Sequence, residues 1–234
     1  MKRRTASQSL LHTLRAALLR VAEPERARAM QTYMKSTMPY HGVGAAAVRA
    51  VCKDVFTSYD FESAERWRAD VLTLWNGADF REERYAAISL SGHRGAKSFQ
   101  TLEALPMYEE MVIGGAWWDY VDALAAHRIG PLLEAHPREL RRTLLHWSHA
   151  DDIWKRRSAI LAQLAFRERT DLTLLFACID PSLDEQELFL RKAIGWALRQ
   201  AARHHEPAIV RYVRDHAERL SPLSQREALK HVKG

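Results

Sequence analysis

Apolar side chains return every three or four residues along nearly all of this 234-residue chain. Between residues 43 and 56, for example, Val48, Val51, Cys52, Val55 and Phe56 fall on one face of a helix. Segments of alternating polarity, which are typical of half-buried strands, are lacking. Ten Gly and eight Pro are too few for an all-β sandwich, which needs a turn every ~8–12 residues. The periodicity therefore predicts an all-α fold.

Interruptions of this pattern divide the chain into a dozen or more short helices, one of which closes over 33–38 before Pro39. The others are expected at 1–21, 43–56, 61–75, 80–90, 98–113, 116–126, 128–136, 138–149, 150–168, 171–179, 184–204, 206–219 and 223–232. Gly114 and Gly115 are expected to break the chain, and Ser224 and Glu227 have the spacing of a capping box. Helix pairs of roughly 35–45 residues would give about six HEAT-like repeats, an α-solenoid with a concave face formed as a single domain over 1–234. A compact helical bundle is the alternative.

Charge and cysteine usage restrict the setting and the partners of the protein. Lys and Arg number 35 against 29 acids, and a formal charge of +6 permits a polyanionic partner such as nucleic acid. No apolar run approaches the ~18 residues that a membrane span needs. The start, with Lys2, Arg3 and Arg4, predicts an amphipathic first helix rather than a secretion signal. Cys52 and Cys178 form no disulfide framework, so we expect a reducing compartment, the cytoplasm.

Motifs for cofactor and metal chemistry are lacking. The chain has no Walker loop, no G-x-G-x-x-G and no G-x-S-x-G. Its eleven histidines lack the spacing of a metal site. We therefore expect no cofactor and no metal.

The segment 117–122 reads Trp-Trp-Asp-Tyr-Val-Asp and follows a glycine pair. Trp118 and Asp122 are four residues apart, so they share one helix face. The simple alternative is that one Trp fills the core while Asp122 pairs with an arginine. Adjacent residues point ~100° apart on a helix, so both indoles need not be buried.

Two later segments combine cations with tryptophans. Lys155, Arg156 and Arg157 lie near a predicted helix start and are well placed to meet phosphates, although two preceding aspartates also suit a solvated basic face. In the segment 190–199, Gly195 costs ~1 kcal/mol against Ala inside a helix, which indicates close packing or the close approach of a ligand. Trp196 beside it could equally be an ordinary core residue.

Three strings in this order resemble the DNA alkylation repair family of HEAT-like repeat DNA glycosylases. They are Trp-Trp-Asp-x-Val-Asp at 117–122, Ile-Trp-x-x-Arg at 153–157 and Lys-Ala-Ile-Gly-Trp-x-Leu-Arg at 192–199. The resemblance runs from about residue 29 to residue 231. The loop 91–98 is unlike the family pattern and the segment 1–28 matches it only loosely, so no site residue is taken from them.

The resemblance implies a role for several individual residues. Trp118 and Trp196 match the two indoles that pack along the DNA backbone at the lesion, and Asp122 matches the catalytic carboxylate. Arg157 matches a basic residue of the same site, and Tyr33 an aromatic residue that also faces DNA. Further phosphate contacts would come from Lys155, Arg156, Lys192 and Arg199.

For function, the resemblance implies a monofunctional glycosylase of base excision repair. Its substrates would be cationic N-alkylpurines in double-stranded DNA, such as 3-methyladenine and 7-methylguanine, cleaved without base flipping. The protein would act as a monomer in the cytoplasm, at the nucleoid. Two alternatives remain: a non-catalytic HEAT-like module that binds damaged or branched DNA, and a protein–protein scaffold.

Overall fold

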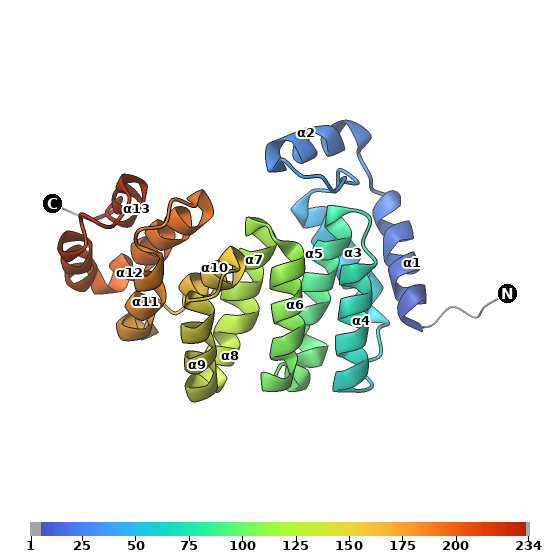
Figure 1. Cartoon of the computed structure of the whole chain (residues 1–234). Helices are drawn as coiled ribbons and strands as arrows, with labels where there is room; N and C mark the ends of the chain where they lie inside the picture. Colours follow the sequence, from blue (N-terminus) through green and yellow to red (C-terminus); the bar gives the residue numbers. More distant parts are fainter. Residues whose placement is uncertain (1–5, 233–234) are drawn as a thin grey trace. The chain divides into compact units, whose positions relative to one another are not determined.

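The computed structural model describes residues 6–232, and over this range every regular element is helical and no strand forms (Figure 1). The predicted all-α fold is confirmed. Backbone contacts group the chain into two compact units, residues 1–107 and 108–234. A single domain over 1–234 and its concave face remain predictions. None of the described helices is long and apolar enough to cross a membrane.

The first unit is a helical bundle with one helix set apart. Its elements are α1 (Ala6–Leu19), α2 (Pro24–Met34), α3 (Ala45–Thr57), α4 (Ala64–Asn76) and α5 (Arg81–Ser91), followed by the 3₁₀ turns η1 (Arg94–Phe99) and η2 (Leu102–Ala104). Helices α1, α3, α4 and α5 pack on one another around buried residues that include Leu14, Phe56, Trp67 and Trp75. Within α2 only Met34 is buried, and Figure 1 shows this helix beside the ends of the others rather than among them.

The chain between α2 and α3 is fixed by two buried carboxylates at the start of α5. Glu82 accepts hydrogen bonds from the backbone N–H groups of His41, Gly42 and Val43 at 3.0, 2.9 and 2.9 Å. Gly42 has φ +85°, and a Cβ there would lie 2.0 Å from the carbonyl oxygen of Glu23, so only glycine fits. Gly42 therefore lies directly against Glu23, the residue before α2, and the Glu23 N–H donates to the carbonyl of His41 at 3.1 Å.

Glu83 is the second of these carboxylates, and it joins three parts of the first unit. Its Oε1 lies 2.7 Å from Nε of Arg15 and 3.2 Å from Nε2 of His41, and its Oε2 accepts the backbone N–H of Asp79 at 2.8 Å. Burial alone would raise the pKa of Glu83, but these bonds outweigh it and lower the pKa to about 2. The carboxylate is thus ionised at neutral pH and holds α1 to α5.

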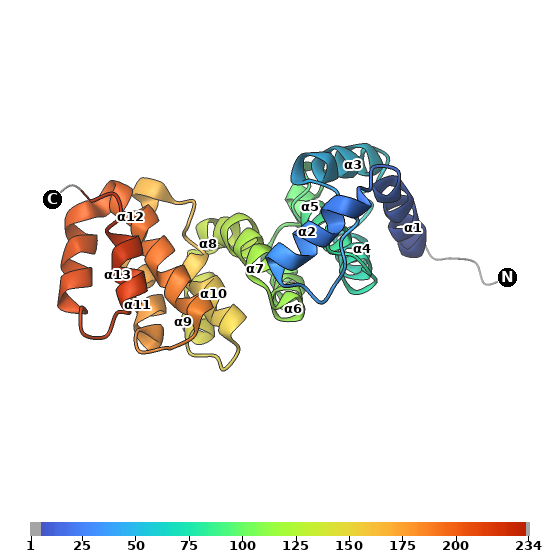
Figure 2. The same cartoon turned by 90° about the horizontal axis from the view of Figure 1, so that it is seen from above.

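The second unit is built around α10. Its elements are α6 (Leu105–Gly115, which begins at the end of the first unit), α7 (Trp118–Leu124), the π-helical turn η3 (Ala125–Ile129), α8 (Gly130–Ala135), α9 (Pro137–Ser148), α10 (Ile153–Leu161), η4 (Arg167–Arg169), α11 (Leu172–Ile179), η5 (Asp180–Ser182), α12 (Leu188–Asp215) and α13 (Pro222–Ala228). Helix α10 packs against α7, α9, α11 and α12, and Figure 2 shows α12 and α13 side by side. Short helices that pack on their sequence neighbours are the arrangement of HEAT-like repeats.

Several predicted boundaries were wrong because local geometry overrides periodicity. Helix α2 ends at Met34 instead of continuing to residue 38, since Lys35 adopts φ 48° and its N–H caps the carbonyls of Gln31 and Thr32. The helix expected from residue 98 starts at Leu105, after two 3₁₀ turns. The expected break between 184–204 and 206–219 is confirmed, because His205 within α12 has non-helical backbone (φ −133°), two residues before Pro207, whereas the helix starts at Leu188 rather than at residue 184.

Two sequence signals that we expected to mark helix ends have other roles in the structure. Helix α6 runs through both glycines of the expected break, and the chain turns at Ala116, which has φ 42°. The expected capping box is wrong: α13 begins earlier, and its N-cap is Ser221, whose Oγ accepts the N–H of Ser224 at 3.0 Å. The basic residues 2–4 of the expected first helix lie outside the described residues.

Candidate active site

Asp122 and Arg157, 35 residues apart in sequence, form a two-pronged ion pair between α7 and α10. Arg157 Nε donates to Asp122 Oδ1 at 2.7 Å, and Nη2 donates to Oδ2 at 2.8 Å. Nη1 of the same guanidinium donates to the backbone carbonyl of Phe189 in α12. The arginine therefore holds the carboxylate in one orientation and ties three helices together.

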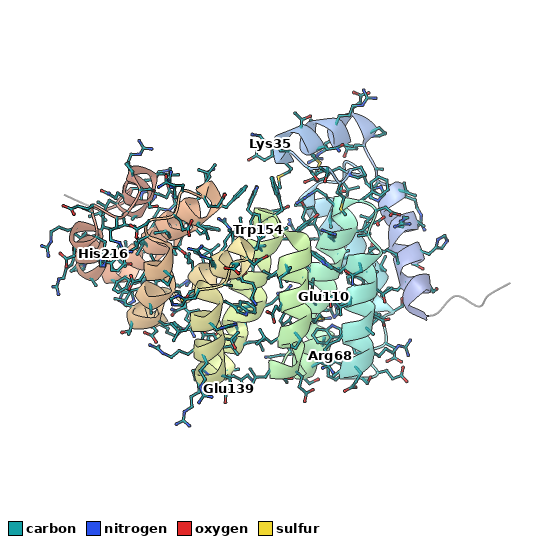
Figure 3. All side chains as sticks on the ribbon, viewed as in Figure 1. Lys35, Arg68, Glu110, Glu139, Trp154 and His216 are labelled. Carbon is teal, nitrogen blue, oxygen red and sulfur yellow. The ribbon has the colours of Figure 1, made fainter. Side chains whose placement is uncertain are left out.

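Local sequence fixes both partners of this pair. The turn at Ala116 brings α7 to its start at Trp118, so Asp122 follows one turn into the helix. Helix α10 is capped by Asp152, whose Oδ1 accepts the N–H groups of Trp154 and Lys155 at 2.9 and 2.8 Å. Figure 3 shows Trp154 near this end of α10, one turn before Arg157.

The pair is largely shielded from water, with 5% of the Arg157 side chain exposed and 12% of the Asp122 side chain. Burial raises the pKa of Asp122 above its usual range, while the hydrogen bonds and the charge of Arg157 act in the opposite direction. Removing the arginine would leave burial unopposed. Arg157 thus opposes the effect of burial on the pKa of Asp122.

The remaining exposed edge of Asp122 opens on a groove of about 460 Å³. Trp196 of α12 lines this groove, as do His127 in η3 and Gln200 one turn beyond Trp196. Its other walls are small or apolar side chains: Ala123, Ala126, Leu164 and Ala165. The groove brings an anionic oxygen pair, an indole face and two polar side chains together within the second unit.

Trp118 and Trp196 differ from the other tryptophans around the site. Both are half-buried, and neither stacks on a ring nor forms a hydrogen bond with any residue in the described range 6–232. Trp117, by contrast, packs with its ring centroid 6.4 Å from that of Trp154 and 5.4 Å from that of Phe189. Of the adjacent indoles, Trp117 therefore belongs to the packing behind the site, and Trp118 is free to meet a ligand.

Gly195 serves helix packing. A Cβ at this position would lie 2.7 Å from Cβ of Glu227 and 3.1 Å from the carbonyl oxygen of Ser224. Helix α13 thus approaches α12 closely at this point. Of the two readings of this glycine, close packing is the one confirmed.

Most of the predicted phosphate-binding cations already have anionic partners. Lys155 Nζ lies 2.6 Å from Glu109 Oε1, and Arg156 Nη1 lies 2.8 Å from Glu185 Oε1. Arg199 pairs with a carboxylate of α13. Lys192 is exposed and pairs with no side chain in the described range. These pairings involve long-range contacts that a local basic run does not reveal.

Tyr33 lies in the first unit, on α2. Its side chain is 79% exposed, far more than is usual for an aromatic residue. Such exposure fits a surface that meets a partner. Its role at DNA remains a prediction.

His127 and Gln200 are site residues that sequence reasoning missed. His127 lies five residues after Asp122, within the π-helical turn at 125–129, and Gln200 lies four residues after Trp196 and next to Arg199. A π-helical turn contains one extra residue and leaves no mark in the pattern of apolar residues, so the position of His127 at the groove could be found only from the structure. Burial and the neighbouring Arg128 lower the pKa of His127, so its imidazole is neutral at pH 7.

No group of three His, Cys, Asp or Glu side chains within the described residues has the geometry of a metal site.

Comparison with known proteins shows the family of this chain. The family model for the DNA alkylation repair enzyme matches residues 14–232. The chain belongs to the DNA alkylation repair enzyme family. The matched range includes Asp122, Arg157, Trp118 and Trp196.

A solved structure is similar over most of its length. It is described as a predicted DNA alkylation repair enzyme from Enterococcus faecalis, and it shares 29% sequence identity with a TM-score of 0.82. The match covers 90% of this chain and 96% of that one. None of the curated proteins matches this chain. The family resemblance inferred from the three sequence strings is thus confirmed.

Proposed function

We propose that this member of the DNA alkylation repair enzyme family is a monofunctional DNA glycosylase that hydrolyses the N-glycosidic bond of cationic N-alkylpurines. The observation that carries the proposal is the Asp122 carboxylate, oriented by Arg157 and open to the groove that Trp196 lines. Substrates with this chemistry include 3-methyladenine and 7-methylguanine in duplex DNA.

The charge of the substrate explains why one carboxylate suffices. When the bond between C1′ and the ring nitrogen breaks, its electron pair goes to the base and cancels the positive charge of the ring. The base leaves neutral, so no acid need protonate it. The sugar becomes electron-poor, and a nearby carboxylate lowers the energy of that cation. Water then adds to C1′, and Asp122 can orient it or accept its proton.

Arg157 acts in this scheme as a positioning residue. Its two-pronged pairing occupies one side of each carboxylate oxygen and leaves the other side available to the sugar or to water. It also opposes the rise in the pKa of Asp122 that burial causes. The guanidinium of Arg157 is buried and already paired with Asp122, so in this proposal its main partner is the carboxylate rather than a phosphate.

Two half-buried indoles supply attraction for a positive charge: Trp118, and Trp196, which packs on the core of the second unit and lines the groove. An indole face attracts a cation by ~0.5–2 kcal/mol, and more when water is excluded. Trp118 and Trp196 would favour the charged lesion and the charged sugar together. Many glycosylases flip the base into a snug pocket. The groove beside Asp122 is open, which supports a reaction in which the lesion stays stacked.

The remaining predicted contacts position the DNA. Lys192 can meet a phosphate directly, whereas Lys155, Arg156 and Arg199 must first exchange their carboxylate partners. Tyr33 would meet DNA from α2. Phosphate contacts of this kind set position rather than sequence preference. The cleavage site therefore depends on the lesion itself.

Release of free methylated purine from methylated duplex DNA, measured by liquid chromatography, tests the proposal. Asp122→Asn keeps the shape of the side chain and removes its charge, so it should lose at least about a hundredfold in rate while still binding DNA. Trp117→Phe, in the packing behind the site, is the matched control and should retain most of the rate. Binding without base release by the wild type would favour the non-catalytic module.

A further inference from the structure

The groove beside Asp122 continues beyond the proposed cleavage site. Leu164 and Gln200 line both this groove and a narrow adjoining crevice of about 10 Å³, room for roughly one water molecule. Arg167, in η4, is among the residues that line this crevice. One continuous surface of the second unit therefore leads from Asp122 along α12 to an arginine.

Arg167 is held in an uncommon conformation. Its φ is 58°, in the left-handed region that costs a non-glycine residue roughly 1–2 kcal/mol. Its carbonyl accepts hydrogen bonds from the N–H and the hydroxyl of Thr170, at 3.2 and 2.7 Å. These bonds fix the backbone from which the exposed side chain projects. Residues kept in strained conformations cluster at ligand sites.

Arg167 is also unneutralised, unlike its neighbours. In the same turn, Arg169 pairs with Glu134, and Glu168 lies 3.9 Å from His204. Across the described part of the chain, no carboxylate pairs with Arg167, and the Gln200 amide forms no hydrogen bond. Both groups are available to a ligand.

The lining of this surface selects one class of ligand. Next to Asp122 the walls are small and apolar, which suits the carbon face of a deoxyribose. The adjoining crevice adds the free guanidinium of Arg167 to the free amide of Gln200, which lines both the groove and the crevice, and the guanidinium fork matches the oxygens of a phosphate. We propose that Arg167, with Gln200, forms a binding subsite for a phosphodiester of the DNA strand that carries the lesion. This inference rests on the proposed function.

Binding of a lesion duplex tests the subsite directly. The duplex carries 7-methylguanine on a 2′-fluoro sugar, which resists cleavage because fluorine destabilises the electron-poor sugar. Wild type is compared with Arg167→Gln and with Arg138→Gln, an exposed arginine of α9 that lines no part of the groove. Glutamine adopts the left-handed backbone as readily as arginine does, and equal melting temperatures would show that folding is unchanged.

Salt dependence reports the loss of a single phosphate contact. One contact contributes about 0.9 to the slope of log K against log salt, so a fourfold rise in salt should weaken wild-type binding about 3.5-fold more than it weakens Arg167→Gln. Arg138→Gln should keep the wild-type slope. In a scan that replaces each phosphate by a neutral methylphosphonate, one position in the lesion strand should weaken wild type and have no further effect on Arg167→Gln.

Two results would overturn the inference, and they differ. If Arg167→Gln keeps the wild-type slope and methylphosphonate profile while wild type still excises methylpurine, the subsite is wrong and the glycosylase stands. If wild type neither binds the duplex nor releases base, the proposed function fails as well. Restoration of the slope by Arg167→Lys, which retains the charge, would support a phosphate contact.

Discussion

Replacing Arg157 by alanine isolates the energetic role of the central ion pair. The change leaves the Asp122 side chain, which is 12% exposed, without its counter-charge, and it removes the bond to the Phe189 carbonyl. Removing one partner of a buried pair costs ~3–5 kcal/mol. Protonation limits this cost, since neutralising an aspartate of ordinary pKa at pH 7 takes only ~4 kcal/mol. We therefore expect the free energy of unfolding to fall by about 3–4 kcal/mol at pH 7.

The loss should depend on pH in a defined direction. Without Arg157, burial raises the pKa of folded Asp122 above its unfolded value. A raised acid pKa leaves stability intact below the unfolded pKa and reduces it by ~1.4 kcal/mol per pH unit above that value, until the folded pKa is reached. The destabilisation by Arg157→Ala should therefore be up to ~2.7 kcal/mol smaller at pH 5 than at pH 7.

Denaturant unfolding at pH 5, 6 and 7 measures this difference. The same substitution in an Asp122→Asn background is the control, and its cost should not vary with pH because no carboxylate remains. A loss below about 1 kcal/mol that is equal at all three pH values would refute the reasoning, since it would mean that water solvates Asp122 well enough to replace the arginine.

Three further changes test other parts of the structure. Glu83→Gln should cost about 3 kcal/mol at neutral pH and abolish a loss of stability that wild type shows as pH falls from about 4.5 to about 2, measured by unfolding across that range. Gly195→Ala should lower stability by ~1–3 kcal/mol, because the new methyl group meets Glu227 at 2.7 Å, and an unchanged melting temperature would contradict the packing. Trp118→Ala and Trp196→Ala should each slow purine release by about 2- to 30-fold, with a lower melting temperature for Trp196→Ala because Trp196 packs against the core of the second unit, and equal slowing for neutral lesions would argue against cation attraction.

Local sequence patterns determined the fold class and half of the site. Helical periodicity depends only on neighbours three and four residues apart, so it predicted an all-α chain correctly. The same spacing placed Trp118 and Asp122 on one face of α7, and Asp122 lines the groove. The three motif strings identified the family, because three strings in one order at matching separations are far more specific than any one of them.

Tertiary packing decided the rest. The pairing of Asp122 with Arg157 joins positions 35 residues apart, and the carboxylate partners of Lys155, Arg156 and Arg199 also come from other helices. A basic run looks the same in sequence whether its charges are neutralised or free. Periodicity shows which face of a helix is buried, but the contacts that this face makes are set only when the helices pack.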